Sequence, residues 1–87
     1  KEKLEAELKI YPNPCKNSKV TIEFNTKEIS EIRLVNITGK EVLQKKYDFA
    51  THKTQLNLDD IPNGIYLIQI KTTDNKKTVK KLMVSKN

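Results

Sequence analysis

Turn-forming residues interrupt this chain about every ten residues, which leaves room only for short elements between them. The turn signals are "YPNP" at 11–14, "TGK" at 38–40, "PNG" at 62–64 and "TDNKK" at 73–77. The segments between them alternate polar and apolar residues with a period of two, as strands with one buried face do. The sequence therefore predicts an all-β domain.

This alternation predicts seven short strands and no convincing helix. The expected strands lie at 7–12, 19–24, 31–37, 41–49, 54–61, 64–72 and 78–85. The strand at 31–37 carries apolar residues on both faces, as a central strand would, and the strand at 64–72 is the most apolar and is expected to be the most buried. Leu43, Tyr47 and Phe49 are expected to share one mixed face. The pattern predicts a seven-stranded, immunoglobulin-like β-sandwich.

The turns have residues suited to tight backbone geometry. Gly39 in "ITGKEV" can adopt a positive φ at no steric cost and predicts a hairpin. Asn63 and Gly64 tolerate the turn that Pro62 begins. The position of Tyr66 shortly after this turn resembles a tyrosine corner, in which the phenol hydroxyl binds the preceding loop. Turn geometry is thus the favoured role of the glycines, and core packing that of Tyr66.

The length of 87 residues indicates one domain, which we place at residues 6–87 after a charged linker at 1–5. Because the chain starts with lysine, we expect it to be a piece of a longer protein. Cys15 is alone, so an internal disulfide is excluded, and a small packing residue is the expected role.

The net charge of +6 suggests nucleic acid, an anionic surface or an acidic partner, or only the protection of sheet edges by lysine. Arg33 is the only arginine, although arginine is the residue that best recognises phosphates and bases. Most of the aromatic residues fall on apolar strand faces, where they cannot serve as stacking platforms. We therefore expect no nucleic-acid partner.

Catalytic and metal-binding patterns are weak. His52 is the only histidine and lies in a polar stretch, and one histidine with one cysteine does not make a zinc site. Asp59 and Asp60 would face opposite sides of a strand, which suits neither acid–base catalysis nor, without more oxygens, calcium. We expect no catalytic residue, metal, cofactor or small-molecule substrate.

Three stretches in order resemble the C-terminal sorting domain of type IX secretion cargo in Bacteroidetes-type bacteria, the Por secretion system tail of type A. The first motif, residues 10–24, begins with Tyr11, Pro12, Asn13 and Pro14. The second motif, residues 32–42, is "IRLVNITGKEV", with Asn36 where the family usually has aspartate. The third motif, residues 58–86, contains "NGIY" and ends in "KKLMVSK". Asparagine keeps the acceptor carbonyl of aspartate, so we expect the turn in the second motif to survive.

The resemblance implies a non-catalytic sorting signal fused to the C-terminus of a cargo protein. The cargo would fold in the periplasm and reach the cell surface or the medium through the outer-membrane translocon and its shuttle proteins. A cell-surface sortase would then usually remove the domain.

The final strand would be the part of the domain that the machinery recognises. We expect this role of Lys80, Lys81, Leu82, Met83 and Val84. An open edge strand lets a partner add a strand of its own, and the two lysines would point to opposite faces. Edge protection is the alternative role of the lysines.

Two other functions remain open from the sequence. One is a generic fibronectin-like or carbohydrate-binding sandwich that acts as a spacer or adhesion module, although tryptophan is absent. The other is a basic nucleic-acid binder, which a steep salt dependence of binding would support.

Overall fold

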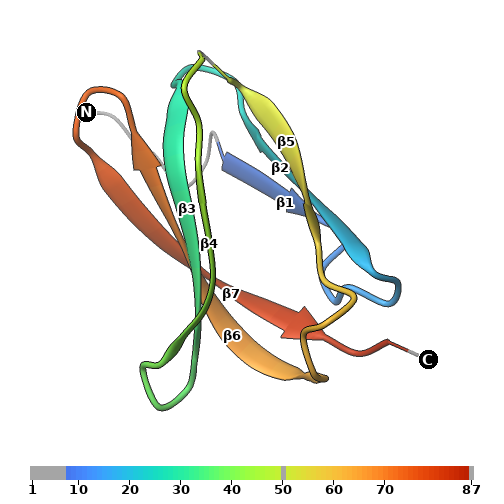
Figure 1. The fold of residues 1–87 in the computed structure, drawn as a ribbon. Helices are drawn as coiled ribbons and strands as arrows, with labels where there is room; N and C mark the ends of the chain where they lie inside the picture. The colour runs from blue at the N-terminus through green and yellow to red at the C-terminus, as the bar shows by residue number, and fades with distance from the viewer. Residues whose placement is uncertain (1–7, 50, 87) are drawn as a thin grey trace.

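We describe residues 8–49 and 51–86 of the chain in a computed structural model, so the linker predicted at 1–5 lies outside the described residues. Seven strands form two antiparallel sheets that pack face to face (Figure 1). The strands are β1 (Leu8–Tyr11), β2 (Lys19–Phe24), β3 (Ile29–Asn36), β4 (Glu41–Lys46), β5 (Lys53–Asn57), β6 (Gly64–Thr72) and β7 (Lys77–Val84). The strand order is β1-β2-β5 in one sheet and β4-β3-β6-β7 in the other. The part of the chain described here holds no helix with the length and hydropathy that crossing a membrane requires.

The core lies between the two sheets and is built by the predicted alternation. Val20, Ile22 and Phe24 of β2 are all fully buried, and Ile68 and Ile70 of β6 face them from the other sheet. Cys15 is also fully buried in this cluster, which confirms its packing role. The predicted sandwich is therefore correct in its strand number and its layers.

The expectation that β6 is buried holds for only one of its two faces. Tyr66, Ile68 and Ile70 point inward, whereas Ile65 and Leu67 keep 43% and 40% of their surface exposed. β6 is central within its sheet, but nothing among the described residues covers the outer face of that sheet. Apolar composition alone could not distinguish a strand covered on both faces from one covered on a single face.

The predicted strands at 41–49 and 54–61 are too long. β4 ends at Lys46, where the chain begins to cross to the other sheet, and Phe49 is 84% exposed rather than part of a core face. β5 ends at Asn57, and the N–H of Ile61 then donates to the carbonyl of Leu58 at 3.0 Å in a turn. The apolar pattern continues past the end of β5 because Leu58 and Ile61 are buried in this turn without belonging to a strand.

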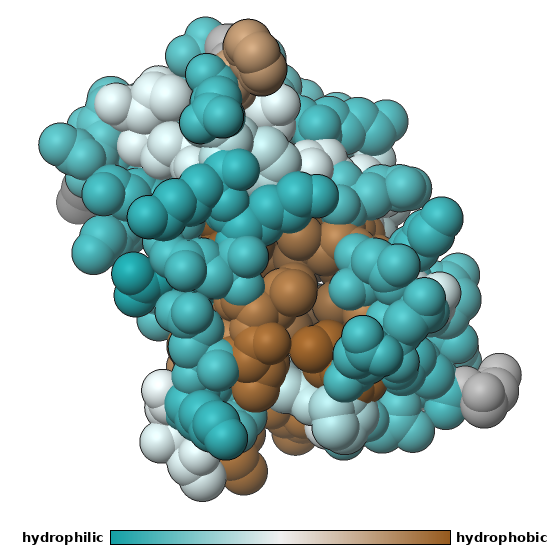
Figure 2. Space-filling view, viewed as in Figure 1, coloured by the Kyte–Doolittle hydropathy of each residue, from teal (hydrophilic) through white to brown (hydrophobic). Residues whose placement is uncertain are grey.

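Two kinds of contact close the open sides of the sandwich. On the side of β4 and β5, the Tyr47 hydroxyl lies 2.9 Å from the Thr54 hydroxyl, and Val42 and Leu43 pack half-buried against the core. Figure 2 shows apolar surface gathered between these two edges, with polar side chains on either side. On the side of β1 and β7, the loop after β1 crosses to β7 and places Cys15 beside Val84.

The β6–β7 hairpin contains a carboxylate that should make stability depend on acid. Hydrogen bonds from the Thr72 hydroxyl and from Lys27, whose Nζ is 3.0 Å away, lower the pKa of Asp74 from 3.8 to about 2. Hydrogen bonds from Gln44 and Arg33 likewise lower the pKa of Glu31 from 4.5. A lowered folded-state pKa contributes stability that is present above the ordinary value and is lost as the pH falls.

We therefore expect the melting temperature to fall as the pH drops from about 4.5 to about 2. The variant Asp74→Asn should lose less stability across this window than the parent chain, because it lacks one of the groups that must be protonated. Thermal melts at pH 6 and pH 2.5 measure both slopes. Equal losses in the two proteins would contradict the contribution of Asp74.

Candidate recognition surface

The residues expected to be recognised on β7 divide between its two faces. Leu82 and Val84 are 0% and 1% exposed and belong to the core, so a partner of the folded domain cannot contact their side chains. Lys81 and Met83 are exposed on the outer face of the sheet, and Lys80 lies half-buried on the inner side at the edge. Of these five residues, only Lys81 and Met83 therefore present their side chains on the outer face.

The first motif covers the outer edge of β7. The Nδ2 of Asn13 donates to the carbonyl of Lys81 at 3.0 Å, and its Oδ1 accepts from the N–H of Met83 at 3.1 Å. The amide of Asn13 thus pairs with β7 as the peptide group of a neighbouring strand would. Cys15 continues the pairing, because its N–H donates to the Met83 carbonyl at 2.7 Å and its carbonyl accepts from the N–H of Ser85 at 2.8 Å.

This arrangement corrects the expectation of an open edge strand. From Lys81 to Ser85 the outward backbone groups of β7 are already bound by the loop after β1. A partner strand could not pair there without first displacing Asn13 and Cys15. Backbone pairing by a partner is therefore confined to the other end of β7, near Val79.

The third motif closes on itself in a similar way. Asn63 donates from Nδ2 to the carbonyl of Lys86 at 3.2 Å and accepts at Oδ1 from the N–H of Lys86 at 2.8 Å. The Nζ of Lys86 donates to the carbonyls of Leu58 at 2.7 Å and Asp59 at 3.1 Å. Lys86 is thus held by the side chain of Asn63 and, through its own ammonium group, by the backbone carbonyls of Leu58 and Asp59.

Tyr66 fixes the same turn from inside. Its ring is 5% exposed, and its hydroxyl donates to the carbonyl of Pro62 at 2.6 Å. The predicted tyrosine corner is therefore present, with the Pro62 carbonyl as the acceptor. Gly64 lies between them with a φ of +157°.

Asn36 organises the hairpin of the second motif. Its Oδ1 accepts from the N–H of Thr38 at 3.0 Å, from the Thr38 hydroxyl at 2.7 Å and from the N–H of Lys40 at 2.9 Å. Gly39 completes the turn with a φ of +91°, where an L side chain would be strained. All three contacts of Asn36 use only the oxygen, so the expectation that asparagine preserves the turn is confirmed.

The other candidate groups do not converge on a site. Nδ1 of His52 lies 3.2 Å from the carbonyl of Phe24, which can only accept a hydrogen bond. Asp59 and Asp60 are exposed in a turn, and no three acidic, histidine or cysteine residues gather within the described ranges. Tyr11 and Phe49 are the described aromatic residues with large exposure, and the hydroxyl of Tyr11 is bound to Glu23 at 2.9 Å.

Each of the three motifs therefore has a structural role. The first and third hold the end of β7, and the second forms the β3–β4 hairpin. Residues 9–85 match the secretion system C-terminal sorting domain family, the Por secretion tail. The chain belongs to this family. It is a C-terminal sorting signal of the type IX secretion system, and the family is a sorting module that is non-catalytic in itself. Such a signal implies export to the cell surface or the medium.

Two relatives share this domain with the chain. An ulvan lyase of Nonlabens ulvanivorans is 28% identical over 92% of the chain, and an endo-acting ulvan lyase of Formosa agariphila is 27% identical over 93%. The chain spans 15% of the length of each.

Solved structures support the fold of the sorting domain. A DUF3244 family protein of Bacteroides vulgatus with an immunoglobulin-like β-sandwich matches with a TM-score of 0.71 at 11% identity, covering 88% of this chain and 83% of that one. CopC of Methylosinus trichosporium matches with a TM-score of 0.55 at 17% identity, covering 92% and 93%. These likenesses show the fold alone.

Sequence reasoning missed the contacts between motifs. It read "YPNP" as the end of a strand and did not pair Asn13 with β7. One signal was available: both turns contain proline followed by asparagine, at Pro12–Asn13 and Pro62–Asn63, and both asparagines bind the end of the chain. The spacing of 70 residues between Asn13 and Met83 hides the first of these contacts from any local pattern.

Proposed function

We propose that this sorting domain brings a cargo fused to its N-terminus to the type IX outer-membrane translocon and its shuttle proteins. The cargo passes through the periplasm, and a cell-surface sortase then removes the domain. Lys80, Lys81 and Met83 contribute contacts to this machinery, and Leu82 and Val84 hold the strand that carries them. The domain uses no cofactor.

One observation carries the proposal. Asn13 and Asn63 bind the backbone at both ends of the segment from Lys81 to Lys86, so the end of the chain has a fixed shape. A segment without such contacts would keep much of its backbone freedom until a partner bound it. A fixed and exposed pair, Lys81 and Met83, suits recognition, since little side-chain and backbone freedom remains to be lost on binding.

The proposal is tested by the export of a reporter. Residues 1–87 are fused to the C-terminus of a fluorescent protein that carries a periplasmic signal peptide, in a host with an intact type IX system. A strain without the translocon and a fusion that stops at Asp74 are the matched controls. We expect fluorescence at the surface or in the medium only with the full domain and the intact translocon.

Retention of every fusion in the periplasm would reject the proposal and favour a spacer or adhesion module. Binding of the folded domain to immobilised polysaccharide, unaffected by Lys80→Ala with Lys81→Ala, would support that alternative directly. The fusion that stops at Asp74 lacks β7 and with it the core residues Leu82 and Val84, so its export is compared directly with that of the full domain.

The lysines of β7 can be tested without disturbing the core. The double variant Lys80→Ala with Lys81→Ala should keep its free energy of unfolding within about 1 kcal/mol, because neither side chain is fully buried. Its export should nevertheless fall. The matched control is Lys9→Ala with Lys53→Ala, which removes the same charge from two exposed positions on the other sheet. Export at the parent level would leave the lysines with edge protection only.

A further inference from the structure

The outer face of β6 and β7 departs from the polar surface expected of a sandwich. Seven large apolar side chains are exposed among the described residues, and four of them lie on these two strands. These four are Ile65, Leu67, Val79 and Met83, with between 38% and 43% of their surface exposed. Gathered apolar surface of this kind marks interaction sites more often than scattered single residues do.

The strand register places these side chains together. Ile65 pairs with Met83, and the next outward pair along the strands is Leu67 with Lys81. Outward-facing neighbours in an antiparallel pair lie within contact range of each other. The apolar side chains thus form one strip, which begins where the third motif holds the end of the chain.

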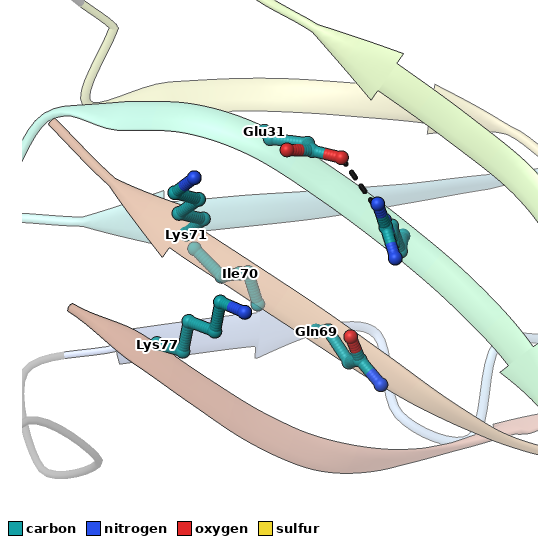
Figure 3. A pocket seen from close by; sticks show the side chains of 6 residues that line it. Glu31, Gln69, Ile70, Lys71 and Lys77 are labelled. Atoms are coloured by element: carbon teal, nitrogen blue, oxygen red, sulfur yellow. Dashed lines mark hydrogen bonds and ion pairs between the residues drawn. The ribbon is translucent and has the colours of Figure 1, made fainter. Parts of the chain in front are cut away.

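The other end of the same face is basic. Lys71 pairs directly with Lys77, although like charges opposite each other are unfavourable. Both lysines line a shallow depression of about 70 Å³, together with Arg33, Gln69, Glu31 and Ile70 (Figure 3). Within the described ranges no carboxylate forms an ion pair with Lys71, Lys77 or Lys81.

The neighbouring half of the sheet behaves differently. On β3 and β4, Arg33 binds Glu31 at 3.0 Å and Glu41 at 3.5 Å, so its charge is balanced locally. On this half of the sheet Arg33 is therefore neutralised, whereas Lys71, Lys77 and Lys81 have no ion pair among the described residues and lie on the strands that also expose the apolar strip.

We propose that the outer face of β6 and β7 is a docking surface for a protein partner whose own surface is apolar at its centre and carries carboxylates at one side. The proposal rests on the sorting function and defines where and how the export machinery contacts the domain. The apolar strip formed by Ile65, Leu67, Val79 and Met83 provides the apolar contact. Lys71, Lys77 and Lys81 steer and orient the partner, as complementary charges at interfaces do. A phosphate-bearing surface would need only the lysines and would leave the apolar strip exposed, so the strip favours a protein partner.

A substitution at Leu67 tests whether the apolar strip binds a partner or is merely exposed. Leu67→Glu places a carboxylate opposite Lys81, an opposite-charge pair that the strand tolerates. Phe49→Glu is the matched control, because it introduces the same group at an exposed apolar position away from the face. In the reporter assay we expect Leu67→Glu to lower export by about tenfold or more, as loss of an interface anchor does, and Phe49→Glu to match the parent.

Leu67→Thr removes the apolar side chain but introduces a β-branched residue that favours strands, so a loss of export by this variant is not a loss of folding. Melts of all variants accompany the export measurement. The charge test compares the double variant Lys71→Glu with Lys77→Glu against the double variant Lys16→Glu with Lys19→Glu, whose exposed positions lie away from this face, and only the first should reduce export. Parent-level export of Leu67→Glu, or equal losses in the face variants and their controls, would overturn the docking surface while leaving the sorting function intact.

Failure of the parent domain to direct export would instead reject the sorting function, and this surface with it. Two further measurements identify a different occupant. Sedimentation that detects a dimer of residues 1–87, dissociated by Leu67→Glu, would assign the face to a second copy. Binding to vesicles that contain lipopolysaccharide, abolished by Leu67→Glu, would assign it to a lipid surface. Either result overturns the proposal of a protein partner.

Discussion

Replacement of Tyr66 by alanine is expected to lower the free energy of unfolding by about 3–5 kcal/mol, as other large-to-small changes in cores do. The ring is 5% exposed and belongs to the core cluster between the two sheets. Its hydroxyl also holds the turn before β6 through the Pro62 carbonyl at 2.6 Å. Removing the side chain therefore leaves a cavity and frees the turn at once.

Denaturant unfolding measures this loss, and Tyr66→Phe separates its two parts. Phenylalanine keeps the packing and removes only the hydrogen bond, so we expect a cost of about 1 kcal/mol. An alanine variant as stable as the phenylalanine variant would show that the ring contributes little to the core.

Replacement of Asn13 by aspartate is expected to lower the free energy of unfolding by about 1–2 kcal/mol, because a needed donor becomes an acceptor. Nδ2 of Asn13 donates to the carbonyl of Lys81, whereas a carboxylate there would face that carbonyl with a second acceptor. The variant should also loosen the end of β7, which hydrogen exchange at the Met83 and Ser85 amides would detect.

The same substitution at Asn36 is the matched control. All side-chain contacts of Asn36 accept hydrogen bonds at Oδ1, and a carboxylate can accept each of them. Asn36→Asp should therefore change the free energy of unfolding by no more than about 0.5 kcal/mol. Equal losses at Asn13 and Asn36 would contradict the hydrogen-bond directions assigned to the two amides.

These contacts link the two proposals about recognition. The loop that carries Asn13 covers the edge of β7 from Lys81 to Ser85, so partners of the folded domain meet side chains there rather than free backbone. The exposed side chains along this stretch, Lys81 and Met83, belong to the outer face of β6 and β7. Recognition of the terminal strand and docking on the outer face are therefore aspects of one surface.

The sequence by itself determined the elements. Strict alternation predicted the bounds of β2, and an apolar run between two turns predicted those of β6. The turn residues Gly39, Asn63 and Gly64 predicted where the chain reverses. These predictions succeeded because each depends on neighbours within a few residues, through the period of the strand and the allowed φ of the turn.

Tertiary structure alone decided which face of a strand is covered and what its edge contacts. Ile65 and Leu67 are apolar like buried residues, yet they are exposed because no third layer lies over β6 in the described part of the chain. Phe49 is exposed because the chain leaves the sheet before reaching it. Asn13 binds Met83 because the sandwich brings the loop after β1 to the edge of β7. The physical reason is common to all three: burial and edge pairing depend on residues far away in the sequence, and no local pattern records them.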